Sequence, residues 1–363
     1  MRNRRGSVGR AGCGLFFGGI LLVGALISLW INEGRTNMAK VAEASIRVAI
    51  EEIQTIENGS FIALQGRLEG VEPIGDAPLL KPGPYIEIQR DVEVYAWEEK
   101  SSSSDNSDNP SYIYEAEWTD EQEDSSKFND PLGHENPPLA YLEKTIRTPR
   151  GRIGSIRVET AELSQLPLSP LPLTQTLLRA DDVDLALKRK IEGNYLFIGS
   201  GSLNEPEIGD VRITYQVFES DQRVTLFGQL MDETIVPYID RDDNRLYRAF
   251  VSGRDEAIQQ MGQEYQFLLW GIRFGGLVMN WIGLMVLVAP LTSLLGRIPG
   301  LGRLGNRVIG LVALVFAFLW TTIVILVSIV AHNPILLVLF LLMGFGVGYW
   351  LWQQRKETLS QAV

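Results

Sequence analysis

The chain has 363 residues, with 33 Lys and Arg, 44 Asp and Glu, two histidines, one cysteine and a net charge of −11. This acidic balance disfavours nucleic acid as a partner, because phosphate backbones bind basic surfaces. The few Cys and His residues argue against a structural zinc site, which needs three or four such ligands, and a single cysteine excludes an internal disulfide.

Residues 1–10 are basic and precede an uncharged apolar stretch over 11–31. As a helix this stretch is about 30 Å long, the thickness of the hydrocarbon core of a bilayer. It ends in the bulky residues Leu29, Trp30 and Ile31, whereas a cleaved signal peptide ends in small residues. We therefore predict an uncleaved transmembrane helix, with a long signal peptide as the alternative.

A polar segment follows this stretch directly, at Asn32, Glu33, Gly34 and Arg35. We interpret it as an interfacial collar. In this hypothesis Glu33 and Arg35 pair with each other or with lipid headgroups, Gly34 permits a bend, and the collar sets the angle between the following domain and the bilayer.

Residues 32–272 form a predicted extracytoplasmic domain. Between 33 and 272 lie 23 of the 33 basic and 43 of the 44 acidic residues, which gives this region a net charge of −20. An apolar stripe beginning at Met38 predicts an amphipathic helix over 37–57. The rest of the domain alternates apolar and polar residues as strands do, and the serine- and acid-rich stretch 98–111 predicts a mobile loop. Asn58-Gly59-Ser60 is a glycosylation sequon that we interpret as a turn.

Ser252 stands three residues before Asp255 and predicts a capping box that opens a helix running unbroken into a second apolar stretch, 273–296. Two more apolar stretches cover 308–331 and 335–352, and only the turn 332–334 separates them, so we expect an antiparallel helix pair. The connecting loop 297–307 and the tail 353–363 are basic.

The positive-inside rule places these basic segments and the N-terminus on the cytoplasmic side. The predicted fold is therefore a membrane protein of the α+β class, with four transmembrane helices plus a β-rich mixed extracytoplasmic domain. Small residues predict close helix packing at Gly275, Gly276, Gly344 and Gly348.

Catalytic chemistry finds little support. A Ser-His-Asp triad in the domain would need His134, which lies among the turn residues of "DPLGHENPP". The motif "GSGSLN" (199–204) lacks the Lys of a phosphate-binding loop. We expect no enzymatic activity, no catalytic residue, no metal and no cofactor.

Four short motifs resemble those of the transmembrane protein 43 (LUMA) family. They are "WINEGR" at 30–35, "WGIRFGG" at 270–276, and two signature segments whose residues are Tyr114, Glu117, Trp118, Phe128, Gly133, His134, Asn136 and Pro137, and then Pro206, Gly209, Asp210 and Arg212. The resemblance implies one N-terminal span, a large extracytoplasmic or lumenal domain and three C-terminal spans. It also implies self-association and the organisation of membrane protein complexes, without enzymatic activity.

The leading hypothesis is therefore a self-associating membrane scaffold, with membrane lipids and further copies of the chain as partners. The alternatives are a module that binds lipid or a small ligand, and a membrane hydrolase that uses His134. The resemblance implies the endoplasmic reticulum or inner nuclear membrane for a eukaryotic member, and the cytoplasmic membrane for a bacterial homologue.

Overall fold

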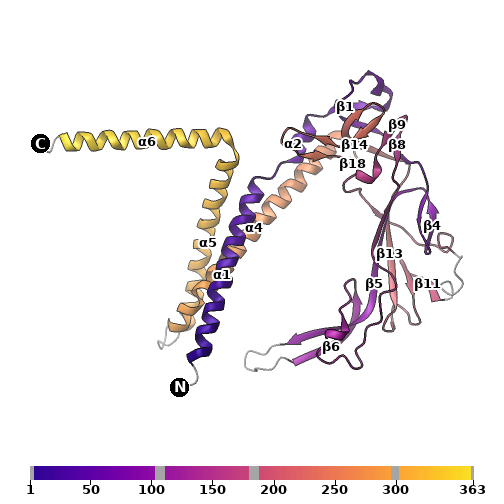
Figure 1. Ribbon diagram of the computed structural model, residues 1–363, viewed down its shortest axis with the longest axis horizontal. Coiled ribbons are helices and arrows are strands. Elements are labelled where there is room, and N and C mark those ends of the chain that lie inside the picture. Colours follow the sequence, from indigo (N-terminus) through magenta and orange to yellow (C-terminus); the bar gives the residue numbers. More distant parts are fainter. Residues whose placement is uncertain (1–3, 103–110, 180–187, 296–301, 361–363) are drawn as a thin grey trace. The chain divides into compact units, whose positions relative to one another are not determined.

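The structure is a computed structural model that describes residues 4–102, 111–179, 188–295 and 302–360. The chain divides into a helical unit, residues 1–39 and 259–363, and a β-rich unit, residues 40–258. Figure 1 labels the main helices and some of the strands. The turn 332–334 is described, whereas 1–3, 103–110, 180–187, 296–301 and 361–363 lie outside the described residues.

Helices occupy all four apolar stretches: α1 (Arg4–Glu33), α4 (Arg254–Leu295), α5 (Gly302–His332) and α6 (Pro334–Ser360). Within the described residues three helices, one in each of the first three stretches, are long and apolar enough to cross a membrane, and Pro334–Val347 of α6 is a shorter apolar helix. The fourth span remains a prediction. The unbroken helix into the second stretch is confirmed by the 42 residues of α4.

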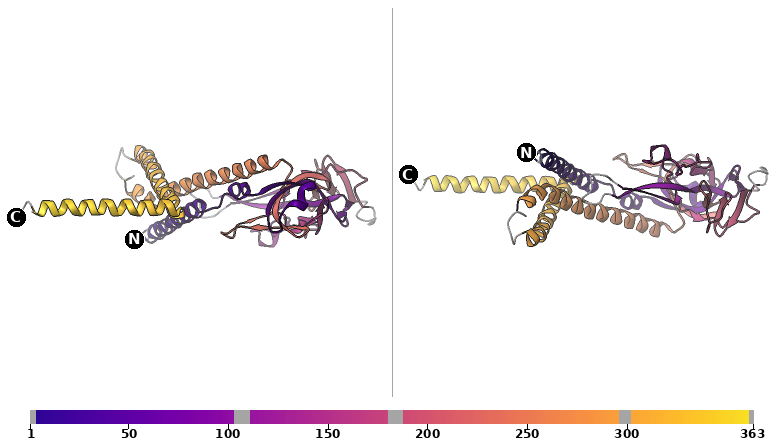
Figure 2. Two further views of the ribbon diagram at one scale, coloured as in Figure 1. Left: turned by 90° about the horizontal axis from the view of Figure 1, so that it is seen from above. Right: turned by 90° about the horizontal axis from the view of Figure 1, so that it is seen from below.

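α6 differs from the expected antiparallel pair. Figure 2 shows it as one continuous helix after α5. Its described apolar side chains from Ile335 to Val347 are exposed, including Leu339 and Phe345. The described side chains of α6, from Ile335 to Val347, therefore bury no face along α5.

Two seven-stranded sheets build the β-rich unit. The first has the strand order β1-β2-β8-β9-β15-β14-β18, and β14 also pairs with β2. Its strands are β1 (Ile46–Ala49), β2 (Phe61–Gly70), β8 (Gly151–Ile153), β9 (Ile156–Val158), β14 (Gln222–Met231), β15 (Thr234–Val236) and β18 (Arg248–Phe250).

The second sheet has the order β11-β12-β13-β5-β6, with β10 attached to β13 and β7 attached to β5. Its strands are β5 (Tyr85–Ser102), β6 (Ser111–Thr119), β7 (Lys144–Arg147), β10 (Ser169–Pro170), β11 (Arg189–Glu192), β12 (Tyr195–Ile198) and β13 (Val211–Glu219). Two small hairpins complete the unit: β3 (Ile74–Asp76) with β4 (Leu80–Gly83), and β16 (Tyr238–Ile239) with β17 (Arg245–Leu246).

Alternation explains why these segments form strands. Along β13 buried and half-buried residues alternate from Val211 to Val217, because successive side chains of a strand point to opposite faces. The buried set joins a core that includes Ile88, Leu196 and Tyr215. The unit has two hydrophobic cores, one mainly under the strands of the first sheet and one mainly under those of the second, and Ile86 of β5 and Phe218 of β13 belong to the first.

The predicted amphipathic helix 37–57 is wrong. The segment divides into a short helix α2 (Met38–Glu43), strand β1 and a 3₁₀ helix η1 (Ile50–Thr55). The Ser45 hydroxyl donates to the Ala42 carbonyl (2.6 Å), and β1 then pairs in parallel with β2. Ile46, on the predicted apolar stripe, is 48% exposed. Tertiary strand pairing has overridden a local helical period.

The predicted acidic loop 98–111 is shorter than expected. Residues 98–102 continue β5 and Ser111 begins β6, in register from Val94↔Thr119 to Ser102↔Ser111. Residues 103–110 lie outside the described residues. The sequon residue Asn58 makes a turn contact, since its side chain exchanges two hydrogen bonds with Asp232 (2.7 and 3.1 Å).

Candidate functional site

Asn136 occupies an edge of β5. Its Oδ1 accepts from the Trp97 N–H (2.8 Å) and its Nδ2 donates to the Trp97 carbonyl (2.9 Å). Two residues further on, the Glu99 N–H donates to the Glu123 carboxylate (3.0 Å). Side chains thus take the place of a neighbouring strand and satisfy backbone groups that need partners.

The same edge continues at Tyr95. Its N–H donates to the Asp210 carbonyl (2.8 Å), and its carbonyl accepts from the Gly209 N–H (2.9 Å). Gly209 has φ +94°, and a Cβ there would lie 2.7 Å from the Pro137 ring. Glycine is required for both reasons. The two signature segments therefore meet along β5.

An aromatic cluster packs on one face of the β5–β6 hairpin. The His134 ring stacks on Tyr114 with centroids 3.9 Å apart and meets Trp97 edge-on at 4.9 Å. The Phe128 ring packs beside Tyr114, with centroids 5.9 Å apart. The Tyr114 hydroxyl donates to Glu99 (2.7 Å) and accepts from the Asp130 N–H (2.8 Å). Desolvation, followed by the bond to Glu99, raises the pKa of Tyr114.

His134 has a structural setting. Its Nδ1 contacts the Asp130 carbonyl oxygen at 3.0 Å. Gly133, with φ +84°, gives the preceding turn its left-handed backbone. Among the described residues no hydroxyl or carboxylate side chain hydrogen-bonds the imidazole, so the geometry of a nucleophile and its base is not assembled there.

Arg212 connects β13 to the neighbouring strands. Its guanidinium donates to both carboxylate oxygens of Glu93 (2.7 and 2.6 Å) and lies over the rings of Trp118 and Tyr195 at 4.6 and 5.0 Å. The bond to Glu93 raises the pKa of Arg212. Glu117, the remaining signature residue of β6, forms an ion pair with Lys100 at 2.7 Å.

Asp210 explains the motif "GSGSLN". Its carboxylate accepts from the backbone N–H groups of Ser200 (3.0 Å), Gly201 (3.2 Å) and Glu207 (2.8 Å). A Cβ at Gly199 would overlap Asp210 Oδ1. The loop therefore holds the protein's own carboxylate where a phosphate loop holds its ligand. Pro206 lies half-buried within the same loop.

In the helical unit the predicted collar residues contact α4 and α5. Glu33 forms a bidentate ion pair with Arg273 (2.8 and 2.7 Å), whereas the hypothesis offered Arg35 or lipid headgroups as its partners. The Asn32 amide donates to the Leu269 carbonyl (3.1 Å), and a Cβ at Gly34 would lie 2.6 Å from His332. Arg35 donates its backbone N–H to the Asn32 carbonyl. Arg273, the first residue of the second apolar stretch, is the partner that sequence reasoning missed.

The predicted packing glycines have different surroundings. A Cβ at Gly276 would lie 2.8 Å from the Leu29 side chain, so this glycine permits close approach of α1 and α4. At Gly275 and Gly344 an added Cβ would meet no heavy atom of the described residues within 4 Å. The side-chain surroundings of Gly348 lie outside the described residues.

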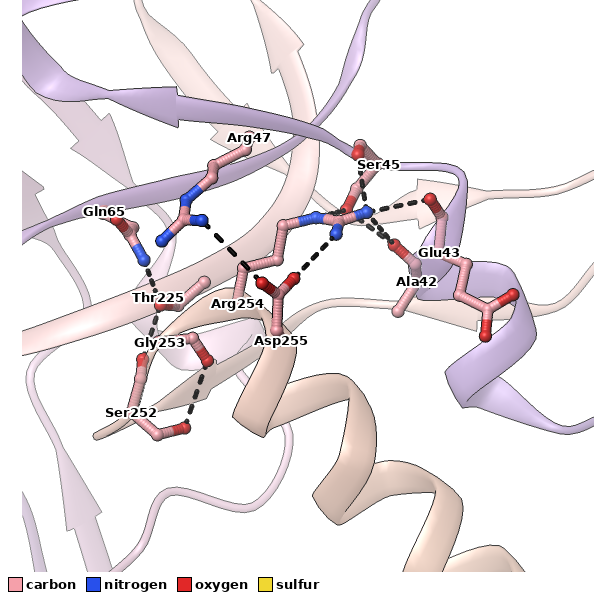
Figure 3. Close-up of polar contacts among 10 residues, drawn as sticks. All are labelled: Ala42, Glu43, Ser45, Arg47, Gln65, Thr225, Ser252, Gly253, Arg254 and Asp255. Carbon is pink, nitrogen blue, oxygen red and sulfur yellow. Dashed lines mark hydrogen bonds and ion pairs between the residues drawn. The ribbon is translucent and has the colours of Figure 1, made fainter.

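Arg254 joins the first and last segments of the β-rich unit, as Figure 3 shows. Its guanidinium donates to the carbonyls of Glu43 (2.8 Å) and Ser45 (2.9 Å) and to the Ser45 hydroxyl (3.1 Å). It thereby satisfies carbonyls at the C-terminal end of α2. The predicted capping box is wrong, because the Ser252 hydroxyl donates to the Gly253 carbonyl (3.4 Å) instead.

Hollows that could hold a ligand lie in both units. A groove of about 580 Å³ on α1 is lined by Phe16, Gly19, Ile20, Val23, Gly24 and Ile27. In the β-rich unit, hollows of about 360 and 250 Å³ lie near Asn58 and near Tyr141. Within the described residues no group of three or more His, Cys, Asp or Glu is placed to hold a metal ion.

The long apolar helices and the two sheets define an integral membrane protein of the α+β class. A family model described as Transmembrane protein 43 matches residues 94–334. The chain belongs to the Transmembrane protein 43 family.

Individual relatives match most of the chain. Transmembrane protein 43 of Rattus norvegicus is 25% identical over 342 residues, covering 88% of this chain and 83% of the relative. The homolog of Drosophila melanogaster is 25% identical over 361 residues, covering 92% of this chain and 93% of the relative. The Homo sapiens protein is 24% identical, and the match covers 88% of this chain and 83% of the relative. No solved structure is significantly similar to the chain.

Proposed function

We propose that this protein is a non-enzymatic, self-associating membrane scaffold that presents its acidic β-rich domain to other membrane proteins. One observation carries the proposal: the polar signature residues are engaged in bonds that hold strands and loops together. Asn136, Asp210 and Arg212 all bond protein groups, as expected for a binding framework and not for a reactive cleft.

The proposed topology has four spans, with both termini cytoplasmic and residues 32–272 extracytoplasmic. The Lys and Arg content of the short flanks supports it. In a Cys13→Ser background, Ser126→Cys should react with an impermeant maleimide from the extracytoplasmic side and Ser360→Cys should not. The opposite pattern would reverse the topology. The membrane concerned is the cytoplasmic membrane for a bacterial chain, or the endoplasmic reticulum or inner nuclear membrane for a eukaryotic one.

The groove on α1 supports the self-association component. Among the described residues no heavy atom lies within 4 Å of a Cβ added at Gly19, so small residues leave room for a second helix. Light scattering on the full-length protein in mild detergent should give a discrete multimer, and Gly19→Leu should lower its mass. Gly275→Leu, at another open position on α4, is the matched control. A monomer at all concentrations would overturn the scaffold.

A second candidate function is lipid or small-ligand binding, favoured by the same groove because an acyl chain also fills an apolar hollow. Native mass spectrometry separates the two. Retained lipid that disappears in Gly19→Leu, without any change in oligomeric mass, would favour the binding module over the scaffold. Hydrolysis through His134 is the third candidate, and activity that survived intact in His134→Ala would remove it.

A further inference from the structure

Among the strands that the structure describes, β6 lies at the end of its sheet, so only one of its two sides is paired there. The direction of its free backbone groups follows from β5. Trp97 and Tyr95 direct both their N–H and their C=O away from β6, toward Asn136 and toward residues 209–210. In an antiparallel pair these directions alternate along the strand.

Ala96 and Glu98 therefore bond their partners on β6, Glu117 and Glu115. It follows that Glu115 and Glu117 use their backbone groups within the hairpin, whereas Tyr112, Tyr114, Ala116 and Trp118 direct theirs outward. In the described part of the chain no backbone group accepts from or donates to these four outward positions.

This contrasts with the far edge of β5, where Asn136 and Glu123 replace a strand. An exposed strand edge can pair with another chain, and proteins therefore cover such edges or place charged side chains beside them. Here one edge of the hairpin is sealed by its own loop, and the other remains open beside charged side chains. An open edge of this kind can accept an added strand.

The face next to the open edge is acidic. Glu115, Glu117 and Glu98 share it with one cation, Lys100, which pairs with Glu115 (2.9 Å) and Glu117 (2.7 Å). Desolvation raises the pKa of Glu98, and its hydrogen bond with Glu117 adds to the rise. Negative charge is therefore in excess there, and an additional cation would be stabilised.

The opposite face is mainly aromatic and already occupied, since Tyr114 and Trp118 contact His134, Tyr95 and Phe197. A strand added at the edge can therefore place its basic side chains on the acidic face and short apolar side chains on the other. A second copy of β6 fits poorly, because the central antiparallel registers set Glu115 or Glu117 opposite another of these carboxylates.

We propose that the open edge of β6 binds an extended segment of a partner protein, paired antiparallel, with Lys or Arg at alternate positions opposite Glu115 and Glu117. This proposal rests on the scaffold function and names the kind of partner that the domain presents itself to. The main-chain bonds supply the shared geometry and the carboxylates select the sequence.

The test uses the full-length protein in mild detergent and a fluorescent peptide of about seven residues with alternating Lys and Val. Its Val residues lie opposite the outward-bonding positions of β6, so their N–H groups donate to β6, and the Lys N–H groups point away. N-methylation of the Val residues should weaken binding by about tenfold or more, and N-methylation of the Lys residues by less than about twofold. Fluorescence anisotropy measures both.

The double variant Glu115→Gln with Glu117→Gln should weaken the binding of the unmethylated peptide by about tenfold. The control double variant, Glu57→Gln with Glu72→Gln, should leave its binding unchanged. Equal binding of the two methylated peptides would reduce the interaction to charge alone and overturn the strand-addition proposal. Absence of peptide binding would overturn it as well. The mass of the protein without peptide tests the scaffold separately, so the failure of one is distinguishable from the failure of the other.

Discussion

The side-chain amide of Asn136 bonds both backbone groups of Trp97, 39 residues away (2.8 and 2.9 Å). It therefore does on one edge of β5 what a neighbouring strand does elsewhere. The loop that carries Asn136 also carries His134 and Phe128, so this pair of hydrogen bonds, together with the Asp130 N–H bond to the Tyr114 hydroxyl, holds the aromatic cluster on the hairpin.

Asn136→Ala should destabilise the β-rich unit by about 1–3 kcal/mol, because it leaves the Trp97 N–H and C=O without partners. Asn136→Asp should lie between the alanine variant and the parent, since a carboxylate accepts from the N–H but cannot donate to the carbonyl. Denaturant titration followed by tryptophan fluorescence measures both. Asn129→Ala, on the same loop, is the control, and an equal loss there would contradict the specific role of Asn136.

Arg254→Ala should loosen the segment from Ala42 to Ala49, because it removes the donors to the Glu43 and Ser45 carbonyls. The expected loss is about 1–3 kcal/mol, and Arg254→Lys should not restore it, since an ammonium lacks the guanidinium fork. Hydrogen exchange of the backbone amides reports the change. Arg47→Ala removes only the exposed pair with Asp255 (3.8 Å) and should alter stability by less than about 0.5 kcal/mol. Unchanged exchange in Arg254→Ala would refute the clamp.

Glu33 and Arg273 should show a coupling free energy of about 0.5–3 kcal/mol in a double-mutant cycle with alanine, because the carboxylate is 3% exposed and bonded at two oxygens. Unfolding of the full-length protein by detergent titration gives the four free energies. The parallel cycle of Glu33 with Arg35 should give a value near zero. A larger coupling with Arg35 would restore the pairing that the sequence suggested.

Alkaline pH should destabilise the β-rich unit through Tyr215 and Tyr247. Burial is the main cause that raises the pKa of each phenol in the folded protein, with Asp76 adding to the rise at Tyr215. Both phenols are neutral in both states below about pH 10, so their contribution is fully present there, and it is lost as the pH rises above the unfolded pKa.

The denaturation midpoint should therefore be lower at about pH 10.5 than at about pH 8. The difference between these two pH values should be smaller in Tyr215→Phe and in Tyr247→Phe. Tyr112→Phe, an exposed position on β6, is the matched control. A pH dependence that is the same in all three variants would assign the effect to other groups.

Local patterns predicted the helical stretches well. An uncharged run such as 308–331 has few alternatives to a long apolar helix, since its backbone groups bond internally and its side chains leave water together. Alternation along residues such as Val211 to Val217 likewise predicted a strand. These properties depend on neighbours in sequence, so they are readable without knowing where the rest of the chain lies.

Where the segments meet was decided by the tertiary structure. The stripe from Met38 to Ile56 fits a helical period, yet pairing with β2 turned its centre into a strand. Glu33 pairs with Arg273, 240 residues away, and the Asp210 carboxylate bonds the backbone of the loop at Gly199 to Gly201. The sequence by itself determined which residues leave water and in which local period. Only the folded chain decided which buried polar groups satisfy one another, because hydrogen bonds and ion pairs form within about 3 Å between groups whose separation along the chain is unconstrained.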